Sequence, residues 1–435
     1  MYTVGIYTLG CKVSQYESEA IGEEFQRRGF TLQDFSDTCD AYLINTCTVT
    51  AESDRKSRQI IRRAREKNPD AVIAVIGCYS EREPKKVYSI DGVRVVLGTD
   101  NKMSVVERVL SVLRGESEGG IFVAPLDAAG FEKMTVTHAK RSRAYIKIED
   151  GCESKCSYCA IRLARGKVRS KNPSELMKEA EYLFSNGVNE IVLTGIETGA
   201  YGRDFENGYT LADLIVDLDK KFPDKRIRLG SLAPELVGKT FSDKLRSVKI
   251  LAPHFHLSMQ SGSDKVLGLM RRRYTASRAL ENINALREVF PDAEFTTDMM
   301  VGFPGEGGED FKLSLDFIEK AGFLDVHVFA YSERAGTEAP KLPCKVPTEI
   351  KKERSRIMID FKEKVREKRL SEIFKRADTL SVVAEILLED GLYSSHAENF
   401  AEIIFKPKSD SDLRGKLVKV RPVSLKDGKI YGEEI

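Results

Sequence analysis

Short apolar runs that alternate with polar, helix-like segments are the feature that most limits how this chain can fold. The first series occupies residues 1 to about 115, and segments with helical spacing, such as residues 57–65, separate its apolar runs. Runs that are apolar at successive positions are typical of parallel strands buried on both faces. The candidate strands are residues 4–9, 42–45, 72–76 and 94–97. This alternation predicts an α/β fold that begins with a doubly wound α/β domain.

A second series of the same kind starts near Ala144. Its candidate strands are residues 145–148, 191–193, 226–230, 255–259, 295–301 and 326–331, and the helices between them include residues 173–185, 277–289 and 310–320. These βα units are too few to close a complete barrel, so they predict a central partial (β/α)6 barrel. In such folds the chemistry lies at the carboxyl ends of the strands.

The end of the chain has a different pattern. Residues 350–377 have the composition of a long charged helix, and from Thr379 onward short strands are separated by turns such as residues 426–428. The expected strands are residues 380–388, 401–405, 416–420 and 429–432, which together predict a small all-β barrel. The predicted domains are therefore residues 1–118, 138–370 and 374–435, with a glycine-containing linker over residues 116–137.

The overall composition excludes some classes of protein. The formal net charge is +2 and 41% of the residues are hydrophobic, so binding to nucleic acid has to be argued from local patches. The longest apolar run, residues 71–77, is far shorter than the roughly 18 residues of a membrane span. The N-terminal residues lack the features of a signal peptide. We expect a cytoplasmic protein without a membrane partner.

Three of the eight cysteines, Cys152, Cys156 and Cys159, follow a predicted strand and turn with the spacing Cys-x-x-x-Cys-x-x-Cys, and we call them the loop trio. Three thiolates on a cubane of four irons leave one iron without a protein ligand. That iron can chelate the amine and carboxylate of S-adenosylmethionine, whose sulfonium bond an electron then breaks. The weaker alternatives are a zinc site and inert cysteines. Zinc requires a fourth ligand nearby, and the nearest histidine, His138, lies before the predicted strand.

Three further cysteines, Cys11, Cys47 and Cys78, each follow a predicted strand of the first domain, and we call them the strand-end trio. The carboxyl ends of parallel strands converge on one crevice of an open α/β sheet. Three thiolates would meet there, so we expect a second iron–sulfur cluster. The alternative is three unrelated buried cysteines. Cys39 and Cys344 have no such placement and are interpreted as structural or incidental.

The two trios and the all-β tail together resemble the methylthiotransferases of the radical S-adenosylmethionine superfamily, over nearly the whole chain. Within that family, residues 7–13 (Tyr-Thr-Leu-Gly-Cys-Lys-Val), 45–50 (Asn-Thr-Cys-Thr-Val-Thr) and 54–59 (Asp-Arg-Lys-Ser-Arg-Gln) are similar to one branch. That branch modifies threonylcarbamoyl-adenosine next to the tRNA anticodon. The isopentenyladenosine branch and the ribosomal-protein aspartate branch have other residues around these cysteines.

The resemblance implies a transferase whose cofactors are two 4Fe–4S clusters and S-adenosylmethionine. The cluster on the loop trio would generate a deoxyadenosyl radical, which removes hydrogen from carbon two of the adenine. The cluster on the strand-end trio would carry or donate sulfur, which is methylated from a second S-adenosylmethionine. The tail resembles a TRAM domain, which implies binding to the tRNA anticodon stem-loop. An electron donor protein and a sulfur source are further implied partners.

The resemblance also implies contacts to S-adenosylmethionine. Tyr158 lies inside the loop trio, and residues 301–306 resemble the loop near the adenine. The other implied cofactor-binding residues, expected at strand ends that face one crevice, are Gly195, Glu197, Ser231, Gln260 and Asp298. Each of these residues could equally serve barrel packing or a turn.

The sequence departs from the family pattern at Ala160, Arg162, Gly230, Ala233 and Ala330. The family usually has Ile-Ile-Pro after the last cysteine of the loop trio, a serine at position 230, an acid at 233 and a proline at 330. These departures leave an inactive iron–sulfur, RNA-binding homologue as an alternative function. A methylthiotransferase acting on a ribosomal-protein side chain would share every cysteine, so that activity also stays open.

Basic residues cluster at several places where they would attract a phosphate-rich substrate. They are Lys140, Arg141 and Arg143; Arg162, Arg165, Lys167, Arg169 and Lys171; Arg271, Arg272 and Arg273; and, in the tail, Lys406, Lys408, Arg414, Lys416, Lys419 and Arg421. Small β-barrels commonly stack RNA bases on aromatic side chains, and Tyr393, Phe400 and Phe405 are the candidates. The alternative is an ordinary solvated charged surface.

Overall fold

The computed structural model of the protein describes residues 1–126, 129–138, 141–409 and 411–435. These residues form two compact units. The first comprises residues within 1–137, 147–172 and 332–337, and the second comprises residues within 138–146, 173–331 and 338–435. None of the helices in the described ranges is both long and apolar enough to cross a membrane.

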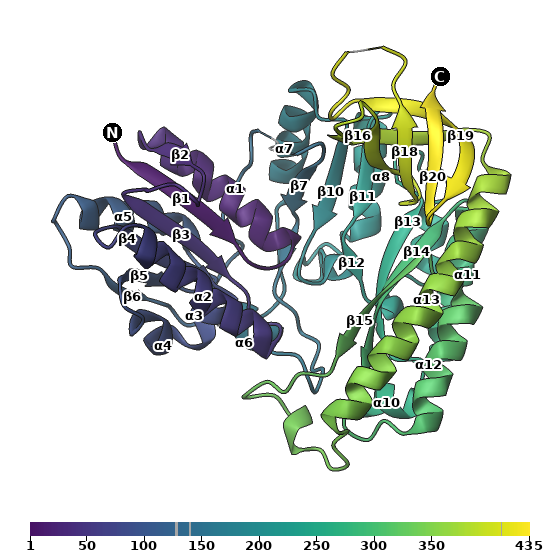
Figure 1. Cartoon of the computed structure of the whole chain (residues 1–435), viewed down its shortest axis with the longest axis horizontal. Helices are drawn as coiled ribbons and strands as arrows, with labels where there is room; N and C mark the ends of the chain where they lie inside the picture. The colour runs from purple at the N-terminus through teal and green to yellow at the C-terminus, as the bar shows by residue number, and fades with distance from the viewer. Residues whose placement is uncertain (127–128, 139–140, 410) are drawn as a thin grey trace. The chain divides into compact units, whose positions relative to one another are not determined.

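A six-stranded sheet forms the centre of the first unit (Figure 1). Its neighbouring strands all pair in parallel, in the order β2-β1-β3-β4-β5-β6. The strands are β1 (Thr3–Thr8), β2 (Thr31–Gln33), β3 (Ala41–Thr46), β4 (Val72–Gly77), β5 (Val93–Leu97) and β6 (Gly120–Phe122). The predicted α/β class and parallel N-terminal sheet are confirmed.

Helices cover both faces of this sheet, which makes it doubly wound. On one face, Val4 and Ala74 pack in a cluster with residues of α1 (Lys12–Arg27) and α5 (Val105–Leu113). On the other face, Tyr42 packs in a cluster with residues of α2 (Ala51–Lys67). Strands β3 and β4 are buried at every position. Burial on both faces explains why their sequences have apolar residues at successive positions.

Within the segment expected to be a linker, residues 116–137, the described residues include a strand and buried side chains. Strand β6 lies within it and pairs in parallel with β5. Further along, Met134 and Val136 are buried. The short strands β2 and β6 escaped prediction because each has three residues at a sheet edge, which is too short for a periodic signal.

The second unit is built around the predicted partial barrel (Figure 1). Its strands form two sheets, β11-β10-β7 and β12-β13-β14-β15, and a single residue, Gly230, separates β11 from β12. The strands are β7 (Ala144–Lys147), β10 (Glu190–Thr194), β11 (Arg226–Leu229), β12 (Ser231–Leu232), β13 (His254–Gln260), β14 (Glu294–Val301) and β15 (Asp325–Ala330). The helices between them include α7 (Pro173–Ser185), α8 (Leu211–Lys221), α11 (Ala276–Val289) and α12 (Gly308–Ala321).

The tail forms a closed barrel in the order β16-β17-β18-β20-β19, which confirms the predicted all-β module. Helix α13 (Thr348–Arg376) precedes it. The strands are β16 (Leu380–Leu387), β17 (Tyr393–Ala397), β18 (Glu402–Lys406), β19 (Leu417–Lys426) and β20 (Lys429–Glu434). Strand β17 was not predicted, because its sequence Tyr-Ser-Ser-His-Ala has few apolar residues.

A buried ion network connects the tail to the partial barrel. The Glu190 side chain is fully buried and contacts Arg143 at 2.5 Å and Arg228 at 2.8 Å. Burial alone would raise the pKa of Glu190, but Arg228, Arg143 and Arg226 outweigh burial and lower that pKa to about 2. Arg228 also donates a hydrogen bond to the backbone oxygen of Ala397 in the tail. The two modules are therefore electrostatically coupled.

Candidate metal centres

The strand-end trio lies at the carboxyl ends of three neighbouring parallel strands. Cys11 caps helix α1 shortly after β1, Cys47 directly follows β3, and Cys78 directly follows β4 as the first residue of α3 (Cys78–Arg82). In sheet order β1, β3 and β4 are adjacent. The fold therefore gathers residues that are far apart in the sequence.

Two glycines let these loops approach one another. Gly10 has φ +129°, and a Cβ placed on it would lie 3.4 Å from the Cβ of Cys47. Gly77 has φ +102°, and a Cβ there would lie 2.6 Å from the backbone oxygen of Thr46. Side chains at either position would be strained, so glycine is required for the close approach of the cysteine loops.

The three thiols of this trio interact electrostatically. Burial raises the pKa of Cys78 to about 12, and Cys47 and Cys11 contribute to the same increase. Burial also raises the pKa of Cys47, to which Cys11 again adds. Charge on Cys11 therefore disfavours charge on Cys47 and Cys78, and a bound cation would reverse this preference because thiolates are the forms that bind metal.

A buried guanidinium points at the most buried of these sulfurs. The Arg165 Nε donates a hydrogen bond to Cys78 Sγ at 3.2 Å, and both side chains are buried. Hydrogen bonds to cluster sulfurs are a means by which proteins tune iron–sulfur centres. A sulfur-only donor set also suits iron–sulfur clusters or zinc. These residues therefore fit an iron–sulfur cluster.

Arg165 is held in a buried network with two carboxylates. Its Nη1 contacts Glu17 at 2.6 Å and Asp150 at 3.2 Å, and Lys147 contacts the same two side chains at 2.9 and 2.5 Å. Burial would raise the pKa values of Glu17 and Asp150, but Arg165 and the neighbouring lysines hold both well below their usual range. Asp150 precedes the loop trio, so one charged cluster links both cysteine trios within the first unit.

The loop trio lies between β8 (Glu149–Asp150) and α6 (Ile161–Arg165). The Cys152 N–H donates to the Gly166 oxygen at 3.0 Å, and the Ile161 N–H donates to Cys159 Sγ at 3.5 Å. All three cysteines are half-buried. Tyr158 lies between them in the same loop and is also half-buried.

The other residues expected to contact S-adenosylmethionine lie in the second unit. Gly195 and Glu197 follow β10, Ser231 begins β12 and Gln260 is the last residue of β13 with φ +71°. Asp298 was expected at a strand end, but it lies inside β14. The assignment of these residues as cofactor contacts stays a prediction.

Glu197 has an unusual environment. Burial raises its pKa to about 7, and its Oε1 accepts a hydrogen bond from the backbone N–H of Ala233 at 2.9 Å. Ala233 replaces an acid of the family pattern, and its backbone takes part in positioning Glu197. The other departure nearby, Gly230, is tightly packed, since a Cβ there would lie 2.8 Å from Thr198 Oγ1.

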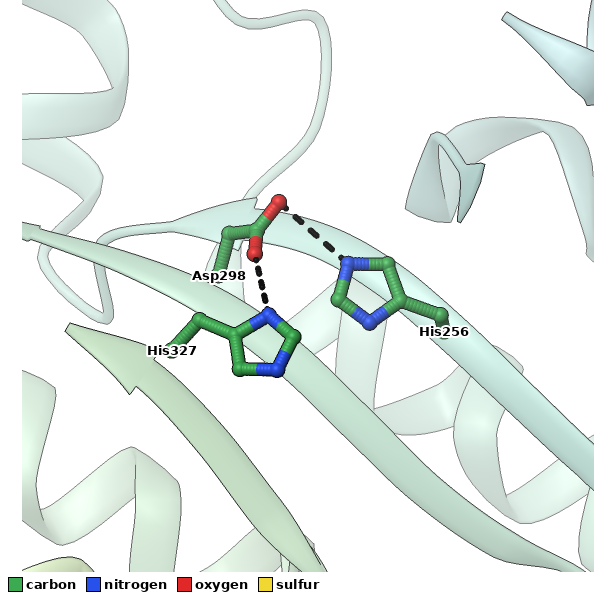
Figure 2. Close-up of side chains that lie close together, drawn as sticks. All are labelled: His256, Asp298 and His327. Carbon is green, nitrogen blue, oxygen red and sulfur yellow. Dashed lines mark hydrogen bonds and ion pairs between the residues drawn. The ribbon is translucent and has the colours of Figure 1, made fainter. Parts of the chain in front are cut away.

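Two histidines flank Asp298, and no sequence motif had indicated them. His256 Nε2 lies 3.2 Å from Asp298 Oδ2, and His327 Nδ1 lies 3.2 Å from Asp298 Oδ1 (Figure 2). Burial would raise the pKa of Asp298, but the two imidazoles hold it well below its usual range. The sequence signal that could have identified this group is that all three residues are polar and lie within strands predicted to be apolar.

The structure changes the interpretation of the basic group after the loop trio. Arg165, Arg169 and Lys171 are buried, so they serve the interior of the first unit and cannot bind phosphate from solvent. Arg162 and Lys167 are exposed as expected. Lys140 lies outside the described residues.

The structure agrees with one of the two RNA-binding features predicted for the tail. Its basic residues, Lys406, Lys408, Arg414, Lys416, Lys419 and Arg421, are all exposed. The proposed stacking aromatics are not available: Tyr393 and Phe405 stack on each other inside the barrel core. Phe400 is stacked between His254 and His396. These rings were needed to fill a small closed barrel.

Two family models match the chain: the Radical SAM superfamily over residues 146–318 and Uncharacterized protein family UPF0004 over residues 3–98. Solved structures share the fold at low identity. The radical S-adenosylmethionine methyltransferase TsrM from Kitasatospora setae is 14% identical with a TM-score of 0.55, covering 76% of this chain and 72% of its own. The cobalamin-dependent S-adenosylmethionine radical enzyme OxsB is 12% identical with a TM-score of 0.51, covering 92% and 64%. The class is therefore that of radical S-adenosylmethionine enzymes.

Curated relatives resolve the family within this class. The threonylcarbamoyladenosine tRNA methylthiotransferase MtaB of Bacillus subtilis (strain 168) is 38% identical over 100% of this chain and 96% of its own length. The Thermotoga maritima protein of the same name is 40% identical over 81% and 80%. A tRNA-2-methylthio-N(6)-dimethylallyladenosine synthase of Acetivibrio thermocellus is 30% identical over 98% and 89%. This chain belongs to the radical S-adenosylmethionine methylthiotransferase family, and it is a transferase.

Proposed function

We propose that the protein converts threonylcarbamoyl-adenosine next to the tRNA anticodon to its 2-methylthio derivative. The observation that carries this proposal is the strand-end trio: three cysteines from adjacent strand ends, with Arg165 directed at Cys78. A radical enzyme needs such a second centre to insert sulfur, whereas the loop trio alone is common to many reactions. The relatives named for threonylcarbamoyladenosine, which match most of this chain, support the choice of nucleoside.

The six cysteines divide between two roles in this proposal. Cys152, Cys156 and Cys159 hold one 4Fe–4S cluster, and Cys11, Cys47 and Cys78 hold the other. When bound, the clusters and S-adenosylmethionine supply the radical, the sulfur and the methyl group. Glu197 binds the methionine amine, for which its partly buried carboxylate is suited, and Tyr158, Gly195, Ser231, Gln260 and Asp298 form the other contacts.

The remaining partners follow from the reaction. The 374–435 domain, which resembles TRAM, and its exposed basic residues bind the anticodon stem-loop, while residues 1–118 and 138–370 hold the two clusters. An electron donor protein reduces the cluster of the loop trio, and a separate sulfur source replenishes the other. Because its substrate is tRNA, the enzyme acts in the cytoplasm.

A second candidate function is methylthiolation of dimethylallyladenosine in tRNA, because relatives with that activity in their names match nearly the whole chain. Dimethylallyladenosine and threonylcarbamoyl-adenosine carry different substituents, so mass analysis distinguishes their methylthio derivatives. A ribosomal-protein side chain as the substrate, or an inactive homologue, would leave both nucleosides without the methylthio group.

The test is nucleoside mass spectrometry of tRNA from cells with the gene, without it, and with a Cys156→Ala copy. The expected result is 2-methylthio-threonylcarbamoyl-adenosine only in the first strain. A change confined to the dimethylallyl derivative would replace the proposed substrate. Unchanged methylthio content in both nucleosides would overturn the proposal and leave the protein substrate or the inactive homologue.

A further inference from the structure

We propose that His256, Asp298 and His327 form a binding site for a first-row divalent cation, with zinc as the preferred ion. The three residues come from the adjacent strands β13, β14 and β15 of the second unit (Figure 2). Neither cysteine trio contributes to this site. The site assigns Asp298 to the ion instead of to S-adenosylmethionine, and the rest of the proposed function does not depend on it.

The donor atoms are close enough to share one ion. One ligand atom from each of the three side chains lies within 4.8 Å of the others, and among the described residues no other His, Cys, Asp or Glu group meets that condition. Each imidazole nitrogen lies 3.2 Å from a carboxylate oxygen. A tetrahedral ion with bonds of about 2.0–2.1 Å has ligand–ligand edges of roughly 3.3 Å. The two 3.2 Å contacts end on different oxygens of Asp298, so the three side chains would have to close from the 4.8 Å spacing to bind one zinc ion.

The strands hold the ligands in this arrangement. Asp298 and His327 are direct partners in the β14–β15 register, so their side chains leave the same face of the sheet side by side. His256 is the partner of Thr296, two residues before Asp298 on the same face of β14. Ligands on neighbouring strands are positioned more precisely than ligands on loops.

The outer shell also matches that of a metal site. Ligating histidines usually bond their second ring nitrogen to another group, which fixes the ring. His256 Nδ1 lies 2.9 Å from Thr296 Oγ1, and His327 Nε2 lies 3.9 Å from Asp325 Oδ2. Asp325 is in turn held by Lys362 at 2.7 Å. The His256 ring is therefore fixed on the side away from the proposed ion, whereas Asp325 lies beside the His327 ring without a hydrogen bond to it.

The site is accessible from one side. The side chain of His256 is 15% exposed and that of Asp298 is 25% exposed, whereas that of His327 is 53% exposed. Three protein ligands with an open side leave a fourth position for water or for an oxygen of a bound molecule, which is the arrangement of a catalytic rather than a structural zinc site. Two imidazoles and one carboxylate favour zinc, manganese or ferrous iron over calcium or magnesium.

The experiment uses the full chain with both clusters reconstituted, dialysed against zinc and then against metal-free buffer. Elemental analysis by mass spectrometry is expected to find about one zinc per chain in addition to the cluster iron. His327→Gln and Asp298→Asn are expected to lose most of that zinc and keep the iron. His396→Gln, which removes a half-buried histidine elsewhere in the second unit, is the matched control and is expected to retain zinc.

Zinc X-ray absorption on the unaltered protein keeps the proposal testable even if a variant misfolds. The expected spectrum has nitrogen and oxygen ligands at about 2.0–2.1 Å, whereas cysteine ligation would give sulfur at about 2.3 Å. Sulfur ligands, zinc retained in both variants, or no zinc after dialysis would each overturn the proposal. The last result would mean that Asp298 merely pairs with two histidines.

Discussion

The two cysteine trios are built in opposite ways. The loop trio lies within residues 152–159, and its half-buried sulfurs belong to one loop. The strand-end trio gathers Cys11, Cys47 and Cys78 from three strand ends, and its members range from exposed to buried. Thiolates on one loop can be placed where a small molecule reaches them, whereas thiolates at strand ends are held in fixed positions by the sheet. This difference suits one trio to bind a small molecule and the other to hold a sulfur-carrying centre.

Their surroundings differ as well. Cys78 is 5% exposed and accepts a hydrogen bond from Arg165. That arginine also contacts Asp150, two residues before Cys152. One buried charge network therefore supports the deep side of the strand-end trio and the entry to the loop trio. Substitutions in each trio and in the groups beside them test how far the two differ.

The largest expected effect comes from breaking the loop trio. Cys156→Ala should abolish deoxyadenosine formation, because the cluster that cleaves S-adenosylmethionine loses a ligand, and should remove about four irons per chain. Iron analysis and chromatography of the cleavage products measure both. The matched control is Cys344→Ala, an exposed cysteine outside both trios, which should change neither. Deoxyadenosine production by the Cys156 variant would remove the assigned role of this trio.

Breaking the strand-end trio should separate the two functions. Cys47→Ala should also lose about four irons per chain, but deoxyadenosine should still form while methylthiolated tRNA does not. The measurement is the amount of deoxyadenosine and of methylthiolated tRNA formed in the same reaction. If the variant loses neither iron nor product, the three cysteines are unrelated residues at neighbouring strand ends.

Altering Arg165 should affect the two trios unequally. Arg165→Met leaves Glu17 and Asp150 short of a buried partner, which should cost about 3–5 kcal/mol of stability in urea unfolding. Arg165→Lys keeps the charge but loses the Nε–H donor to Cys78, so the cluster of the strand-end trio should become harder to reduce. Redox titration monitored by electron paramagnetic resonance measures this. Equal shifts in both clusters would mean that the arginine acts through overall structure.

The smallest expected effect concerns Glu197 and the pH dependence of S-adenosylmethionine binding. Because the pKa of Glu197 is about 7, its carboxylate becomes ionised as pH rises through that value. The affinity for the methionine ammonium group should therefore increase severalfold between about pH 6 and about pH 7.5. Equilibrium binding of S-adenosylmethionine to the reconstituted protein measures it. Glu197→Gln should flatten this dependence with unchanged iron content, and an identical pH profile would exclude Glu197 as a contact.

The sequence predicted most of the architecture where the elements are long and periodic. The helix expected at residues 173–185 is α7 (Pro173–Ser185), and each of the six predicted barrel strands overlaps an observed one, whereas the two-residue strand β12 was missed. Strands β2, β6 and β17 were missed because they are short or polar, so only their pairing partners identify them. The tail aromatics were misassigned to RNA because a sequence does not show which side of a small barrel a ring faces.

The cysteines show the same division. The spacing of the loop trio and the placement of the strand-end trio after predicted strands were enough to predict two clusters, and together with the tail they indicated the family. Only the tertiary structure revealed that Arg165 and Lys171 are interior charges and that His256 and His327 flank Asp298. A charged or imidazole side chain can pair with any suitable group that the fold brings near it, so the sequence alone does not identify its partner. Burial decides their pairing, since an ionised group removed from water must find an opposite charge or a hydrogen bond.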